Sequence, residues 1–205
     1  MADIVTLVMA DHARIRRLFA ELETARDSPS RLPIVWTELA GCLEAHLDAS
    51  EEITYLPLFA DSTTGDEDRR QLADQDADIR EAVAEARLQP AGSRLWWLVV
   101  SAAQTAVDRR IDAIESVPLR RFRQQAPEHA REALGRQWIR FMAALDGDHR
   151  TRPDPNGSRE LGLLRHRWRH RRRWIGKSPT QRDEWRHRHA ESGVIRRRAE
   201  GRISL

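Results

Sequence analysis

Cysteine, lysine and long apolar runs are nearly missing from this sequence. Cys42 is the single cysteine in 205 residues, so the chain cannot form an internal disulfide, which suits a reducing compartment. The apolar stretch WWLVVSAA at 96–103 is far too short to cross a bilayer. Asp3 and Asp11 flank a short apolar run at the start, unlike the pattern of a signal peptide. We therefore expect a cytoplasmic protein with no membrane partner.

Several familiar catalytic signatures are missing as well. The sequence contains no glycine-rich phosphate loop, no serine–histidine–aspartate set and no CxxC pair. The acidic segment TGDEDRR at 64–70 lacks the ligand spacing of a calcium loop. We expect a small-ligand-binding or sensing protein rather than an enzyme with turnover.

The charge is divided very unevenly along the chain. The net charge of +3 is the sum of −7 over residues 1–150, with 19 Arg and 26 acids, and +10 over residues 151–205, with 16 basic residues and 6 acids. The segment RPDPNGS at 152–158 is rich in helix breakers and marks the boundary. We predict a helical domain over 1–148 and a disordered basic tail over 149–205.

Apolar residues recur at spacings of three and four along five segments, which indicates amphipathic helices with one buried face. Valine and isoleucine are sparse beside Ala, Leu, Arg and Glu, a composition that favours helices. Short connections between the first four segments predict an all-α, up-down-up-down four-helix bundle, to which the fifth adds a C-terminal helix. The predicted helices cover residues 3–25, 33–58, 68–88, 94–122 and 127–145.

One polar residue interrupts each of the first four apolar stripes near the middle of its helix. Mid-helix positions lie at similar heights in an antiparallel bundle, so these side chains can meet in one buried layer. Isolated burial of such groups is costly, so we expect them to bind one another or an ion. The fourth helix also echoes the second, because RIDAIE at 110–115 resembles HLDASE at 46–51. The four interrupting residues are His12, His46, Asp76 and Arg110.

Three segments of the chain resemble the hemerythrin-like family, also called the HHE cation-binding domain. They are DIVTLVMADHARIRRLFAEL at 3–22, HLDASEEITYLPLF at 46–59 and LADQDADIREAV at 72–83. The resemblance covers roughly residues 1–145 and implies a four-helix bundle with a non-haem di-iron centre, held by histidines and carboxylates. Members of the family bind oxygen, or serve in sensing and in handling iron or reactive nitrogen and oxygen species.

The resemblance implies a depleted set of metal ligands in this chain. His12 and His46 match the histidines of the first two helices, and Glu115 matches a carboxylate of the fourth. The bridging glutamate is expected four residues after His46, where this chain has Ser50. Glu51 lies about 140° around the helix from His46, so it reaches the site only from the edge.

Two further histidine positions of the family are altered. Asp76 stands at the third-helix position and Arg110 at the fourth. A guanidinium stays protonated, has no lone pair to give and repels a divalent cation. We expect Arg110 to pair with Asp76 or Glu115 and to replace half of the di-iron centre. Three alternatives remain open: two irons, one metal held by His12, His46 and an acid, or no metal. We favour the ion pair without metal.

The resemblance and the altered ligands together suggest a protein that binds non-haem iron and oxygen or another diatomic ligand, with metal binding that is weak, mononuclear or lost. An iron-dependent reaction with peroxide or nitric oxide is an enzyme-class alternative. A second alternative is a metal-free scaffold whose basic tail binds nucleic acid, an acidic protein or the bundle itself.

The tail interleaves Arg, His and Trp over 165–198. Arginine neutralises phosphates and tryptophan stacks on exposed bases, so this composition is compatible with nucleic-acid binding. Lys177 is the one lysine, which suggests a GC-rich coding sequence, and the tail could then be an out-of-frame extension without a selected role. The candidate nucleic-acid residues are Arg167, Trp168, Arg171, Arg172, Arg173 and Trp174.

Overall fold

The computed structural model describes residues 2–59 and 65–150, and in this part of the chain it contains helices and no strand. Residues up to Leu145 form one compact unit, and of the residues after it the structure describes 146–150, the end of the last helix. In chain order the helices are α1 (Ile4–Thr24), α2 (Leu32–Ala49), the π-helix η1 (Ser50–Thr54), α3 (Tyr55–Leu58), α4 (Gly65–Arg87), α5 (Arg94–Ser116), α6 (Pro118–Gln125) and α7 (Glu128–Arg150).

The long helices begin where the local sequence satisfies their first N–H groups. The Asp3 side chain caps α1 by accepting a hydrogen bond of 2.8 Å from the amide of Val5. Ser93 caps α5 in the same way, at 3.2 Å from the amide of Trp96. A proline occupies the first turn of α2, where its missing N–H leaves no helical hydrogen bond unmade.

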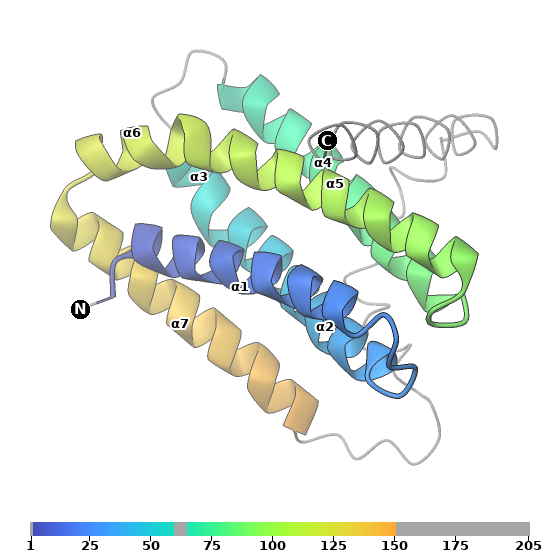
Figure 1. The fold of residues 1–205 in the computed structure, drawn as a ribbon. Coiled ribbons are helices and arrows are strands. Elements are labelled where there is room, and N and C mark those ends of the chain that lie inside the picture. Colours follow the sequence, from blue (N-terminus) through green and yellow to red (C-terminus); the bar gives the residue numbers. More distant parts are fainter. Residues whose placement is uncertain (1, 60–64, 151–205) are drawn as a thin grey trace, which may run out of the picture. The chain divides into compact units, whose positions relative to one another are not determined.

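Helices α1, α2, α4 and α5 form the predicted bundle, and α7 lies along α1 and α2 (Figure 1). The closest pairings of long helices are α1 with α2 and α4 with α5. One core cluster joins Val8 of α1, Ala49 of α2, Ile114 of α5 and Trp138 of α7. The bundle prediction is therefore confirmed, and the C-terminal helix belongs to the same core.

Two of the predicted helices are not regular from end to end. The second passes through η1, a turn of π-helix that adds a residue to the helical repeat. The prediction of one continuous fourth helix over 94–122 was wrong, because α5 ends at Ser116 and a separate helix, α6, begins at Pro118. Val117 adopts φ −128° and ψ −54°, since a residue before proline is disfavoured in the α conformation.

Within the described ranges, no helix is long and apolar enough to cross a membrane. The predicted tail, residues 149–205, lies outside the described part except for the last residues of α7.

Candidate functional site

Four polar side chains are buried at the centre of the bundle, one from each of its four helices α1, α2, α4 and α5. His12 of α1, His46 of α2, Asp76 of α4 and Arg110 of α5 are each at most 2% exposed. The rings of His12 and His46 stand edge to face with centroids 4.9 Å apart, and Arg110 contacts Asp76. The predicted layer of polar residues therefore exists, and it consists of two pairs.

Arg110, Asp76 and Tyr55 form a closed hydrogen-bonded network. The Nε of Arg110 donates to Oδ1 of Asp76 at 2.5 Å, and its Nη2 donates to the Tyr55 hydroxyl at 2.6 Å. The Tyr55 hydroxyl in turn donates to the other carboxylate oxygen of Asp76. Each of these groups thus has a charged or polar partner despite its burial.

The protonation states within this network follow from its contacts. Burial alone would lower the pKa of Arg110, but the charge of Asp76 and the contact with Tyr55 raise it above its usual value. Burial raises the pKa of the Tyr55 phenol, against the effect of the adjacent guanidinium. The network is therefore a guanidinium–carboxylate ion pair joined by a neutral tyrosine hydroxyl.

Tyr55 enters the network because of the π-helix that precedes it. Nine residues separate it from His46, which corresponds to about 180° in a regular α-helix and would place the two on opposite faces. The extra residue in η1 removes about 100° from this rotation, so Tyr55 is buried, at 5% exposure, on the interior side. A local irregularity of the backbone thus supplies the third member of the network.

His12 is held from the outer side of the layer by Glu115. Its Nδ1 lies 2.7 Å from Oε1 of Glu115, whose carboxylate is also bound by Arg16 at 3.2 Å and 3.3 Å. Burial lowers the pKa of His12 to about 2, and the neighbouring His46 and the charges of Arg110 and Arg16 contribute to this lowering. The ring is therefore neutral, and because a carboxylate only accepts, its proton is on Nδ1.

This tautomer leaves a lone pair on Nε2 of His12. The atom is buried and has no hydrogen-bond partner among the described residues. A histidine that ligates a metal commonly donates its other N–H to a carboxylate in this way, which fixes the ring and raises its basicity. Glu115 therefore holds the His12 ring in the way that is typical of a histidine that ligates a metal.

His46 has weaker contacts. Its Nε2 is 3.4 Å from the Ser50 hydroxyl, and its Nδ1 is 3.5 Å from Oδ2 of Asp11, too long for a good hydrogen bond. Neither Nδ1 nor the Asp11 oxygen has another hydrogen-bond partner in the described part of the chain. Burial lowers the pKa of His46, although Asp11 opposes the shift, and the ring of Trp138 lies edge-on at 5.5 Å.

The remaining predicted ligands are not brought together. Glu51 faces outward, with its side chain 42% exposed and an oxygen 3.4 Å from Arg80, so it does not reach the histidines from the edge of the helix. Asp76 is occupied by Arg110, and Glu115 supports His12. No group of three or more His, Cys, Asp or Glu side chains arranged to hold a metal occurs among the described side chains, those of residues 2–59 and 65–145. The nucleic-acid candidates of the tail lie outside these residues.

Sequence reasoning missed four residues that contact the layer. Tyr55 is hidden by the π-helix, and Asp11 directly precedes the recognised His12. Arg16, one turn after His12, could have been read as a partner for a carboxylate of another helix. Trp138 lies in the predicted last helix, but its contact with His46 depends on how that helix packs.

An antiparallel bundle that buries histidines and a carboxylate at mid-height belongs to the class of helical bundles in whose cores metal and ligand sites are built. The family described as Hemerythrin HHE cation binding domain matches residues 3–123, and the chain belongs to this family. No curated protein and no solved structure matches the chain.

A di-iron centre does not fit the residues present. Asp76 is used by Arg110 and Tyr55, and Arg110 places a positive charge with no lone pair in the layer. The described donors that remain in the layer are imidazole nitrogens of His12 and His46; the unpaired Oδ2 of Asp11 lies 3.5 Å from His46, but the described residues include no group of three such side chains arranged to hold a metal. Two imidazoles fall short of the three or four protein ligands typical of a stable site for a transition metal.

Proposed function

We propose that this chain is a small-ligand-binding or sensing member of the HHE family that has no di-iron centre and no catalytic turnover. The network of Arg110, Asp76 and Tyr55 carries the proposal. Its guanidinium stands where the family resemblance gives the fourth helix a ligand, and it provides positive charge where the family places a metal. The carboxylate that would ligate that metal is already neutralised by it.

The charge balance around the layer supports this conclusion. Asp76 pairs with Arg110, and Glu115 pairs with Arg16. In a metal centre these carboxylates would compensate the cations, whereas here arginines compensate them. A divalent ion added to the layer would bring positive charge against a neighbouring guanidinium, in a region of low dielectric where such repulsion is strong.

The histidine pair sets the upper limit on metal binding. His12 has a free lone pair on Nε2 and a supporting carboxylate, and His46 lies within ring contact. The pair can bind one cation weakly or accept a hydrogen bond from a small donor. With two nitrogen donors, we propose that any metal bound is single and readily removed by a chelator.

The test compares ferrous iron binding by metal-free wild type and by Arg110→His, titrated without oxygen and followed by calorimetry. The substitution removes the guanidinium, frees Asp76 and adds an imidazole, so it is expected to raise the affinity and the number of ions bound. Arg87→His is the matched control, because Arg87 pairs with Glu44 outside the layer and its replacement should leave iron binding unchanged. Tight binding of two ions by the wild type would contradict the proposal.

A second candidate function rests on the composition of the tail. Residues 151–205 carry a net charge of +10, with tryptophans placed among the arginines, beside a domain of net charge −7. Phosphate neutralisation by arginine and base stacking by tryptophan are the two contributions that bind single-stranded nucleic acid without sequence preference. We propose nucleic acid as the partner of this segment, with an acidic protein as the alternative.

A further inference from the structure

The ring of Trp138 packs against His46, one member of the histidine pair. Trp138 is 2% exposed, and its ring is 5.5 Å from that of His46 at an interplanar angle of 66°. It belongs to helix α7, which lies beyond the residues that match the family, 3–123. The helix that covers His46 thus lies outside the part of the chain that matches the family.

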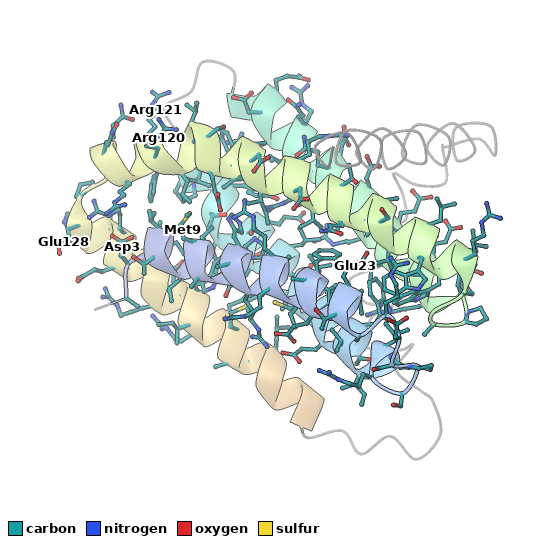
Figure 2. The ribbon with its side chains drawn as sticks, viewed as in Figure 1. Asp3, Met9, Glu23, Arg120, Arg121 and Glu128 are labelled. Carbon is teal, nitrogen blue, oxygen red and sulfur yellow. The ribbon has the colours of Figure 1, made fainter. Side chains whose placement is uncertain are left out.

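Helix α7 approaches the start of α1 very closely. The Nε of Arg131 donates a hydrogen bond of 2.7 Å to Asp3, the residue that caps α1. Figure 2 shows Asp3 and Glu128, the first residue of α7, at the same end of the bundle. At Gly135 a Cβ atom would overlap the carbonyl oxygen of Ala2, so only glycine allows this approach. The contact is made at the N-terminal half of α7, and it sets where Trp138 meets the bundle.

The polar atoms near the covered ring are poorly satisfied. Nδ1 of His46 and Oδ2 of Asp11 are buried 3.5 Å apart, and neither has a hydrogen-bond partner among the residues described. Nε2 of His12, whose ring contacts that of His46, is in the same condition. Unpaired polar atoms of this kind destabilise the closed structure, and a small solute that reached them would satisfy them.

The role of α7 rests on the proposed function, in which the histidine pair is the binding site. We propose that α7 acts as a cover, and that Trp138 is the residue that controls which solutes reach His46 and Asp11. The ligand class is a small solute with a hydrogen-bond donor, or a single cation. Larger ligands are excluded while the indole is in place.

The test measures the access of a small reagent to each histidine. Diethyl pyrocarbonate acylates neutral imidazoles, and peptide mapping by mass spectrometry follows His46 and His12 separately. Exposed His129, on the same helix as Trp138, is an internal reference for an open histidine. The full metal-free chain is used, so the result does not depend on whether the protein binds a metal.

In the wild type, His46 is expected to react at least about tenfold more slowly than His129, and Trp138→Ala should raise its rate toward that of His129. Trp138→Phe should remain close to the wild type because an aromatic ring still fills the position. The control is Ile139→Ala, on the exposed side of α7, which should not change the rate of His46.

Two results would overturn the proposal. One is a folded Trp138→Ala protein in which His46 is as slow as in the wild type. The other is a simultaneous rise at His46, His12 and Cys42 at the rate of global unfolding, because Trp138 would then only stabilise the fold. If Trp138→Ala does not fold, Trp138→Leu gives the same comparison with more of the packing retained, and its failure to fold also counts against the proposal.

Discussion

Removing Asp76 should destabilise the protein far more than removing a carboxylate from a surface ion pair. In Asp76→Ala, Arg110 stays 2% exposed and keeps the Tyr55 hydroxyl as its hydrogen-bond partner, but loses the only carboxylate that contacts it in the described structure. Breaking one side of a buried ion pair costs about 3–5 kcal/mol. Because small proteins have about 5–15 kcal/mol of stability in total, this loss is a large fraction of it.

Glu44 provides the matched control for this experiment. Its carboxylate is 2.6 Å from Arg87, almost as close as Asp76 is to Arg110, but the two side chains are 29% and 41% exposed. Glu44→Ala should therefore cost at most about 1 kcal/mol. The free energy of unfolding is obtained from urea titration followed by tryptophan fluorescence, with the linear extrapolation.

The double variant Asp76→Leu with Arg110→Met separates loss of the charge pair from loss of packing. Replacing both charges by apolar groups should recover much of the stability lost in Asp76→Ala, since the uncompensated charge is gone. An Asp76→Ala protein no less stable than Glu44→Ala would refute the reasoning, because the guanidinium would then not need its carboxylate.

The remaining predictions concern acid and salt. Stability should fall below pH 6.5, because the unfolded chain protonates His12 and His46 there, while folded His12 stays neutral down to its pKa of about 2 and the pKa of folded His46 is also lowered. The expected loss from His12 is about 1.4 kcal/mol per pH unit, and His46 adds to the loss in the same direction. Equal urea midpoints at pH 7 and pH 5 would contradict this prediction. Binding of the full chain to single-stranded DNA should weaken steeply with salt, and alanine at the arginines of 171–173 should reduce the salt dependence by about two released counterions, whereas binding insensitive to salt would exclude the tail as the contact.

The helices and the polar layer could be predicted because both leave periodic signals in the sequence. A stripe of apolar residues with one polar residue in the middle predicts that the segment is a helix and which face of it is buried. It also predicts where along the bundle axis the polar residue lies. This is why His12 and His46 were expected to meet, and why Arg110 was expected beside Asp76 or Glu115, of which the structure gives Asp76. A counter-charge is the only inexpensive way to bury a guanidinium.

Features that depend on irregular backbone or on packing between elements were not predictable in the same way. The π-helix changes the rotation of Tyr55 by an amount that a period of 3.6 residues cannot show. The end of α5 at Ser116 did have a local signal, in the proline two residues later. The position of Trp138 against His46 depends on the close approach at Gly135, which no periodicity encodes.

The most direct test of the central claim is the iron content of the wild-type chain. The protein is purified after growth with added iron, the metal per chain is measured by mass spectrometry, and the absorption spectrum is examined for oxo-bridged ferric iron. Because arginines neutralise Asp76 and Glu115, the account expects less than one iron per chain and no such absorption. Two irons per chain with the oxo-bridged spectrum would contradict it.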